Sequence, residues 1–325
     1  MIRFLSVSPV FATLIPRMRA AAIFGPGSSE KDLKPFQKES NVTWLVGMPT
    51  DSKQADAILI FGGDGTIHRH LEKLVKLQLP VLIVPRGSGN DFARALNLKR
   101  IRHAITAWKK FASNAPNVRT IDLGVITPGA DSAGPAGAGE SKPETQSSLP
   151  RNQKYFCCIA GIGLDVEIAR RANKLPRWVR AHGGYALTLP QALCHFAPFP
   201  MKISIPDTAQ PHGFVERTVK PTLLAAFANA PSYGGGMKIA PQAKLDDGQL
   251  DICLITDIDK FKLFCLFPTV YFGRHLGIPD VEYCQAPSLR VETEHPLDVY
   301  ADGEYVCQTP IELHVAREVL RVIVP

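Results

Sequence analysis

The sequence lacks any long hydrophobic run: none of its 325 residues belongs to a stretch approaching the ~18–20 apolar residues that a membrane-spanning helix requires. It also lacks the Cys-x-x-Cys spacing that is typical of zinc and redox sites. The cysteines are odd in number and lie mostly in apolar runs: Cys157, Cys158, Cys194, Cys253, Cys265, Cys284 and Cys307. This pattern predicts reduced core thiols in a cytoplasmic protein, not a disulfide framework or a zinc site.

Missing motifs exclude two classes of kinase. Neither the Walker A lysine motif nor the signature set of protein kinases occurs. The net charge of +7 permits binding to anionic surfaces, but the basic residues are scattered and nothing resembles a nucleic-acid-binding module. No nucleic acid partner is therefore expected. Residues 1–19 are interpreted as a poorly ordered N-terminal extension.

The stretch 58–68 is the most informative part of the sequence. Its first four residues read as a buried strand, and the glycines of Gly62-Gly63-Asp64-Gly65 are expected to take positive φ and approach a ligand closely. Thr66 stands where an N-cap belongs, and apolar residues at helical spacing follow. Strand, glycine turn and helix N-terminus together predict an anion site, with phosphate the obvious ligand. The Asp-Gly pair is also a hairpin signal, but residues 67–77 do not alternate.

A second unit of the same kind follows. Residues 81–84 predict a buried strand stopped by Pro85, and Asn90 and Asp91 are both good N-caps for a helix that begins with Phe92. Arg86 adds a guanidinium suited to phosphate. Two adjacent strand–loop–helix units predict a parallel sheet whose loops line one crevice at the strand ends.

The rest of the chain suggests two domains. Residues 20–120 predict an α/β domain, 121–305 a β-rich domain, and 306–325 a return to the first. The Gly-, Ser- and Pro-rich residues 128–153 predict a disordered loop at an overgrown hairpin tip. Other expected elements are strands at 20–24, 43–46, 120–126, 155–160, 202–205, 223–228, 250–255, 289–292, 298–300, 311–315 and 320–324, and helices at 32–37 and 101–113. The basic segment 174–182 reads as an ordinary exposed segment, with a membrane-surface contact as the alternative.

Four sequence blocks in order resemble the diacylglycerol kinase catalytic-domain family, the soluble bacterial lipid kinases related to sphingosine and ceramide kinases. The blocks are 62–66, 85–93, 229–241 with 246–251, and 301–304. The resemblance implies a Rossmann-like ATP-binding domain and a β-sandwich domain, with the active site in the interdomain cleft. It further implies phosphoryl transfer from ATP with Mg²⁺ to a lipid hydroxyl. We therefore expect a cytoplasmic protein that associates transiently with the membrane surface, where its lipid substrate lies, and possible homodimers.

The resemblance also assigns roles to individual positions. It implies a catalytic group in which Glu304 is the general base, Asp302 lies beside it, Asp64 is close to the magnesium and Asp122 is a further carboxylate. It implies nucleotide binding by Gly62, Gly63, Asp64, Gly65, Thr66, Gly87, Ser88 and Asn90. A structural magnesium would fall on Asp247, with the carbonyls of Lys244 and Gln249.

The residues themselves agree with these roles. Asp302-Gly303-Glu304 puts two carboxylates on one predicted hairpin turn, where their repulsion can raise the pKa of one. A base near the acceptor hydroxyl and a hard cation on oxygen ligands are what phosphoryl transfer needs. Asp246-Asp247-Gly248 can equally be a plain turn.

Two departures from the family pattern keep other functions open. His68-Arg69 replaces the usual Asn-Glu, and the N-terminal phosphate loop is represented only by 25–29. One alternative is a kinase of a soluble substrate, of the NAD kinase type, which shares the Gly-Gly-Asp-Gly motif. Another is a catalytically inactive regulator that binds nucleotide or lipid. The sequence does not name the lipid.

Overall fold

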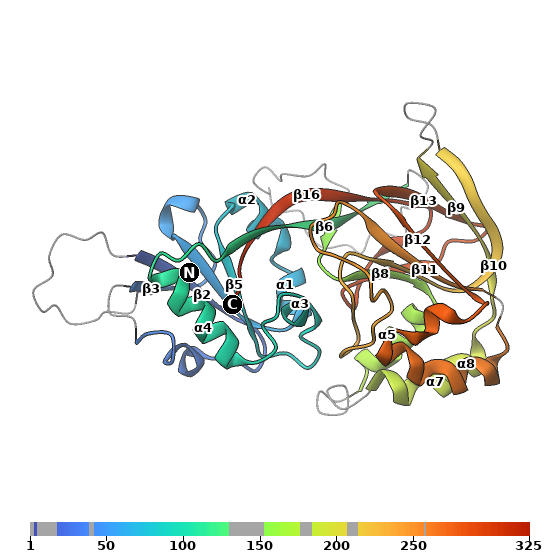
Figure 1. Ribbon diagram of the computed structural model, residues 1–325, viewed down its shortest axis with the longest axis horizontal. Helices are drawn as coiled ribbons and strands as arrows, with labels where there is room; N and C mark the ends of the chain where they lie inside the picture. The colour runs from blue at the N-terminus through green and yellow to red at the C-terminus, as the bar shows by residue number, and fades with distance from the viewer. Residues whose placement is uncertain are drawn as a thin grey trace, which may run out of the picture. The chain divides into compact units, whose positions relative to one another are not determined.

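The computed structural model describes residues 3–4, 18–38, 42–129, 153–175, 184–206, 214–256 and 258–325. It divides into two compact units (Figure 1). Unit 1 comprises Met1–Ile121 with Glu318–Pro325, and unit 2 comprises Asp122–Arg317. The predicted loop 128–153 and the basic segment 174–182 fall mainly outside the described residues.

Unit 1 is built on a parallel sheet in the order β1-β3-β2-β4-β5-β16. Strands β2, β3, β4 and β5 run parallel, β1 adds to β3 in antiparallel sense, and the end of β16 runs parallel to β5. The strands are β1 (Arg3–Phe4), β2 (Met18–Phe24), β3 (Val42–Val46), β4 (Ala57–Gly62) and β5 (Val81–Pro85). The helices are η1 (Glu30–Leu33), η2 (Ser52–Gln54), α1 (Asp64–His68), α2 (Leu71–Leu77), α3 (Asp91–Ala95) and α4 (Ile101–Ala112).

The core of unit 1 explains its continuous apolar strands. Every residue of β4 and β5 is buried, as expected for parallel strands covered on both faces. Trp108 of α4 is fully buried; its indole N–H donates to the Phe36 carbonyl at 3.2 Å and its ring lies 5.4 Å from that of Trp44. The parallel register brings the loops after β2, β4 and β5 to one edge of the sheet.

Unit 2 consists mainly of antiparallel strands. The long strand β10 pairs with β8, β9 and β11, and the ladder continues from β9 to β13 and from β8 to β14 and β15. Its strands are β7 (Lys154–Phe156), β8 (Ile159–Gly163), β9 (Phe199–Pro206), β10 (Phe214–Ala228), β11 (Leu250–Thr256), β12 (Val281–Ala286), β13 (Ser288–Thr293), β14 (Asp298–Ala301) and β15 (Glu304–Gln308). Strands β6 (Val118–Pro128) and β16 (Ile311–Ile323) carry the chain between the units.

Helices cover one side of the unit 2 strands. They are α5 (Leu164–Asn173), α7 (Gly184–His195), α8 (Lys260–Leu266), η3 (Phe267–Phe272) and η4 (Arg274–Gly277). Figure 1 shows α5, α7 and α8 grouped on the same side, and α5 packs on both β8 and α7. A separate apolar core between the strands includes Phe156, Phe227 and Leu289, each with no exposed surface.

Most expected strands are confirmed, including antiparallel pairing of β6 with β7 on either side of the long loop. Four local predictions are wrong. The helix after the glycine turn begins at Asp64, not after Thr66, and is divided into α1 and α2. Residues 32–37 form no long helix, since only the 3-10 turn η1 occurs there. Residues 155–160 are not one strand, because a bend separates β7 from β8. The last two predicted strands are one strand, β16, with an irregularity at Glu318, whose φ is 53°.

The cysteine prediction is confirmed in part. Cys157, Cys158, Cys253 and Cys307 are buried, whereas Cys284 is half-buried and Cys265 is exposed, so Cys265 is not a core thiol. In the part of the chain that the structure describes, no helix is long and apolar enough to span a membrane.

Candidate active site

The glycines of the 62–66 loop serve close packing and do not take positive φ. Gly63 has a φ of −112°, and neither Gly62 nor Gly65 has a positive φ, so that prediction is wrong. A Cβ on Gly63 would lie 2.7 Å from the Gly87 Cα, and one on Gly87 would lie 2.4 Å from the Gly63 Cα. The loops after β4 and β5 therefore touch backbone to backbone, which only glycine permits.

Thr66 occupies the space left by two other glycines. A Cβ on Gly62 would lie 2.6 Å from the Thr66 side chain, and one on Gly25 would lie 2.3 Å from its Oγ1. Thr66 is buried inside the first turn of α1, where its N–H donates to the Gly63 carbonyl at 2.9 Å. The loop after β2 joins this cluster through Ser28, whose hydroxyl donates to the Phe61 carbonyl at 2.7 Å.

Asp64 connects the loop after β4 to the loop after β5. Its two carboxylate oxygens accept the backbone N–H groups of Asp91 at 3.1 Å and Phe92 at 3.0 Å. These donors stand at the N-terminus of α3 and would otherwise lack helical partners. Asp64 thus supplies the cap that the sequence assigned to Asn90 or Asp91. Its predicted place near magnesium stays a prediction.

The remaining residues of the loop after β5 are held within unit 1. Asn90 has a left-handed φ of 57° and braces the loop by bonding the Gly87 N–H at 2.8 Å and the Gly87 carbonyl at 2.7 Å. Arg86 forms an ion pair with Asp32, so its guanidinium is already engaged in unit 1. Ser88 is exposed at the tip of the loop.

In unit 2, Asn229 connects the backbone at Asp122 to the backbone at Cys157. Its side-chain amide donates to the carbonyls of Asp122 and Cys157, each at 3.1 Å. Asp122 is 3% exposed, and its carboxylate accepts the Gly248 N–H at 2.8 Å. Sequence reasoning placed Asn229 in a family block without a role. Its Oδ1 is buried with no hydrogen-bond partner among the described residues.

The predicted structural magnesium residues lie in one loop before β11. Asp247 Oδ1 accepts the Gln249 N–H at 3.1 Å, which is the bond of an Asx-type turn. Lys244 is exposed and Asp247 is half-buried. The turn interpretation is therefore correct, and a cation bound by Asp247 with the carbonyls of Lys244 and Gln249 stays a prediction.

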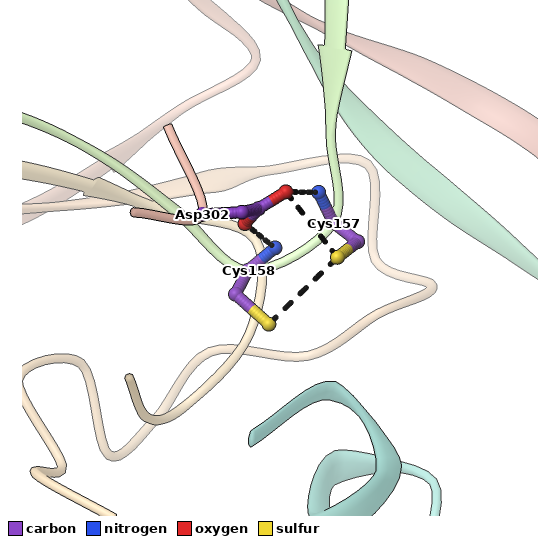
Figure 2. A group of neighbouring side chains, drawn as sticks. All are labelled: Cys157, Cys158 and Asp302. Carbon is purple, nitrogen blue, oxygen red and sulfur yellow. Dashed lines mark hydrogen bonds between the residues drawn. The ribbon is translucent and has the colours of Figure 1, made fainter. Parts of the chain in front are cut away.

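The Asp302-Gly303-Glu304 turn is confirmed as a β-hairpin. Asp302 and Gly303 have φ values of 51° and 87°, the pattern of a two-residue type I′ turn between β14 and β15. The Asp302 carboxylate points back to the β7–β8 bend and accepts the N–H groups of Cys157 at 2.9 Å and Cys158 at 2.8 Å (Figure 2). Glu304 is exposed, so the two carboxylates have different surroundings.

Asp165 is a candidate that sequence reasoning missed. It is 6% exposed, its Oδ1 has no hydrogen-bond partner among the described residues, and burial raises its pKa to about 6 although Tyr233 donates to it. The sequence signal was present, since Asp165 begins a helix directly after an apolar strand.

An apolar cavity lies beside Asp165, inside unit 2. Its volume is about 30 Å³, and Tyr233, the partner of Asp165, is part of its wall. The other lining side chains come from α5, α7, α8, η3 and neighbouring strands: Leu164, Ile168, Leu189, Leu224, Met237, Ile239, Ile255, Leu263, Phe267 and Val270. The wall is apolar except for Tyr233, so its chemistry favours an apolar group of a ligand.

Comparisons with known proteins agree with this architecture. Residues 31–126 match the model of the diacylglycerol kinase catalytic domain, and residues 158–324 match the YegS C-terminal NAD kinase beta sandwich-like domain. A Mycobacterium tuberculosis protein named diacylglycerol kinase is 31% identical over 280 residues, covering 84% of this chain and 78% of its own. A Bacillus subtilis protein named putative lipid kinase YtlR is 27% identical over 272 residues, covering 82% of this chain and 79% of its own.

A solved structure shows the same fold. The crystal structure of a putative diacylglycerol kinase from Bacillus anthracis superposes with a TM-score of 0.66 at 20% identity, covering 95% of this chain and 97% of that one. The predicted α/β class with a β sandwich-like second domain is thereby confirmed. The chain belongs to the diacylglycerol kinase catalytic-domain family of lipid kinases.

Proposed function

We propose that this protein transfers the γ-phosphate of ATP to a hydroxyl of diacylglycerol or a related lipid. The observation that most supports a lipid acceptor is the apolar cavity of unit 2, because a soluble acceptor such as NAD needs polar partners along its length. Tyr233, which donates to Asp165, is the polar residue of the cavity wall, where a lipid's hydroxyl-bearing head would find a hydrogen-bond partner.

The loops of unit 1 fit a nucleotide phosphate. Where Gly63 contacts Gly87, the backbone of both loops is free of side chains. Asp64 holds the loop after β4 against the start of α3 through two hydrogen bonds. We assign the nucleotide to Gly62, Gly63, Asp64, Gly65, Thr66, Gly87, Ser88 and Asn90. The backbone of these loops, free of side chains where Gly63 meets Gly87, would lie against the phosphates, and bound ATP supplies the phosphoryl group.

The donor chemistry of the site fits Mg²⁺. The candidates Asp64, Asp122 and Asp247 offer hard oxygen atoms, and the buried Asn229 Oδ1 is an acceptor that a cation or water would satisfy. When bound, Mg²⁺ neutralises charge on the transferring phosphate. Asp64 would lie close to the magnesium of the nucleotide, whereas a separate structural magnesium would be held by Asp247 with the carbonyl oxygens of Lys244 and Gln249.

We assign the general base to Glu304. It lies at the exposed end of a rigid type I′ turn, and neighbouring Asp302 anchors that turn through the backbone N–H groups of Cys157 and Cys158. A base must be positioned within hydrogen-bond reach of the hydroxyl it deprotonates, so the anchoring is part of the catalytic design.

We propose α8 and η3 as the surface that contacts the membrane. Phe261 and Phe272 are 76% and 73% exposed, and Phe264 lies one turn from Phe261 on α8. Exposed Lys260 and Arg274 flank them and would attract anionic lipid head groups. The inner face of the same helix lines the cavity with Leu263, which would bring the cavity close to the lipid surface.

This contact is tested by sedimentation with anionic lipid vesicles. Phe261→Ser should weaken vesicle binding, whereas the control Phe214→Ser, which removes another exposed phenylalanine of unit 2, should not. Equal binding by Phe261→Ser and the unaltered protein would contradict the assignment.

The replacement of Asn-Glu by His68-Arg69, which favoured an inactive regulator, has in part a structural explanation. Arg69 caps the end of α1, where its Nε donates to the Gly65 carbonyl at 3.0 Å. Arg69 in this loop therefore has a structural purpose and need not indicate lost catalysis.

The test is phosphate transfer from γ-labelled ATP with Mg²⁺, offering diacylglycerol in micelles and, separately, NAD. We expect label in the lipid only, and its loss in Glu304→Gln. The matched control is Glu294→Gln, an exposed glutamate of the same unit, which should retain activity. Label in NAD alone would favour the soluble-substrate kinase. ATP binding without transfer to either acceptor would favour the regulator.

A further inference from the structure

Two adjacent cysteines place both sulfur atoms on the same side of the chain. Neighbouring side chains of an extended strand point to opposite faces, yet the Sγ atoms of Cys157 and Cys158 lie 3.9 Å apart (Figure 2). The bend between β7 and β8 makes this possible. The two thiols therefore form a pair within the reach of a single ligand.

Asp302 fixes the bend and adds an oxygen to the pair. Its carboxylate accepts the N–H groups of Cys157 and Cys158, and of Ile159 at 3.3 Å, while Oδ2 lies 3.3 Å from Cys157 Sγ. From the other side, the Cys158 carbonyl accepts the Asn229 N–H at 2.8 Å. The chain is thus held from both sides, so the ligand atoms are arranged before any ion binds.

The spacing matches the coordination shell of a tetrahedral metal ion. Two sulfur atoms bonded to such an ion at about 2.3 Å lie about 3.8 Å from one another, close to the 3.9 Å observed here. The two sulfur atoms and a carboxylate oxygen of Asp302 all lie within 4.8 Å of one another. In the described part of the chain, no other group of three such side chains has this spacing.

The alternative is that the two thiols bond to one another in a disulfide. Adjacent Cα atoms across a trans peptide lie about 3.8 Å apart, below the roughly 4.4–6.8 Å that an unstrained disulfide requires. Coordination keeps the sulfur atoms at their present separation and needs no such distortion. Thiolate ligands favour soft or borderline cations over Mg²⁺.

We propose that Cys157, Cys158 and Asp302 form a binding site for a thiophilic divalent cation of the zinc and cadmium class. On binding, each thiol releases its proton to solvent and the two thiolates and one carboxylate oxygen bond the ion. Water completes the shell on the half-buried Asp302 side. Because the ion competes with the backbone N–H groups of Cys157 and Cys158 for the Asp302 carboxylate, it weakens the anchor of the Glu304 turn and inhibits phosphoryl transfer. This inhibitory role rests on the proposed function, whereas binding does not.

The binding test titrates the full chain with Cd²⁺ and follows the thiolate-to-cadmium absorption in the ultraviolet. The double variant Cys157→Ser/Cys158→Ser should lose at least about tenfold in affinity, since it loses both sulfur ligands. Cys265→Ser, which removes the exposed thiol of α8, is the control and should bind as the unaltered protein does. Equal affinity of the double variant and the control would overturn the site.

A second measurement covers the case in which the double variant does not fold. X-ray absorption of the Zn²⁺-loaded Cys265→Ser protein should show two sulfur neighbours, and a shell of nitrogen and oxygen alone would overturn the site.

Inhibition is measured separately, as the rate of lipid phosphorylation in Zn²⁺ with and without a chelator. We expect reversible loss in the unaltered protein and none in the double variant. Equal inhibition of both would overturn the inhibitory role while leaving the binding result intact. An unaltered protein that binds Cd²⁺ but phosphorylates no lipid would contradict the proposed function instead.

Discussion

The buried carboxyl group of Asp165 makes the stability of the protein depend on pH. Its pKa is about 6 in the folded chain and 3.8 in an ordinary environment, because burial penalises the charged form more than the hydrogen bond from Tyr233 stabilises it. A raised folded-state pKa means that folding favours the protonated acid. The contribution of Asp165 is therefore fully present below pH 3.8 and is lost as the pH rises through about 6.

The magnitude follows from the size of the shift. A change of one pKa unit corresponds to about 1.4 kcal/mol, so the shift at Asp165 corresponds to about 3 kcal/mol between low pH and pH 8. Roughly half of this difference falls between pH 5 and pH 8. Asp165→Asn removes the titration. The stability of the variant relative to the unaltered protein should thus improve by about 1.4 kcal/mol from pH 5 to pH 8.

The assay is thermal unfolding of both proteins at a series of pH values. For a unit of this size we expect the difference in Tm to change by roughly 3–6 °C in favour of Asp165→Asn as the pH rises. Only this pH dependence is diagnostic, because the new amide adds a constant cost where Oδ1 now lacks a partner. A difference in Tm that is the same at pH 5 and pH 8 would refute the reasoning.

Three further predictions concern unit 1. Gly87→Ala should push the loops after β4 and β5 apart and weaken the binding of an ATP analogue in a titration. The control is Gly277→Ala, which should not weaken binding because its Cβ would meet no atom within 4 Å. Equal affinities of the two variants would contradict the packing argument. Asp64→Asn should lower the free energy of unfolding by about 1–2 kcal/mol in urea, because an NH₂ group would face one of the two N–H donors at α3. Trp108→Ala should cost about 3–5 kcal/mol by the same measurement, and a loss below 1 kcal/mol would show that Trp108 is not a core residue.

Local sequence signals predicted the fold well where the structure depends on neighbours in the chain. The apolar runs of β4 and β5 and the turn at 302–304 follow from periodicity and turn chemistry. The role of Gly63 could not be predicted in this way, because the atom that excludes a side chain belongs to Gly87 in another loop. The capping of α3 by Asp64, 27 residues earlier in the chain, escaped for the same reason.

The parts of the candidate site that were not predicted depend on contacts between residues still farther apart in the sequence. The bend at Cys157 is held by a carboxylate 145 residues away in the sequence, so its sequence looked like a continuous strand. Asp165 acquires its raised pKa from burial and accepts a hydrogen bond from Tyr233, neither of which a short motif encodes. Residue roles inferred from the family blocks remain predictions, since position in a motif does not establish chemistry.

The most direct test of the proposed lipid kinase activity offers the protein lipid and water-soluble acceptors in the same reaction. The full chain is incubated with γ-labelled ATP, Mg²⁺, a total lipid extract and a pool of water-soluble metabolites, and the two phases are then separated. The account predicts label in the organic phase, in a single class of phosphorylated hydroxyl lipid, and no label when Glu304→Gln replaces the unaltered protein. Label confined to a water-soluble product would contradict it.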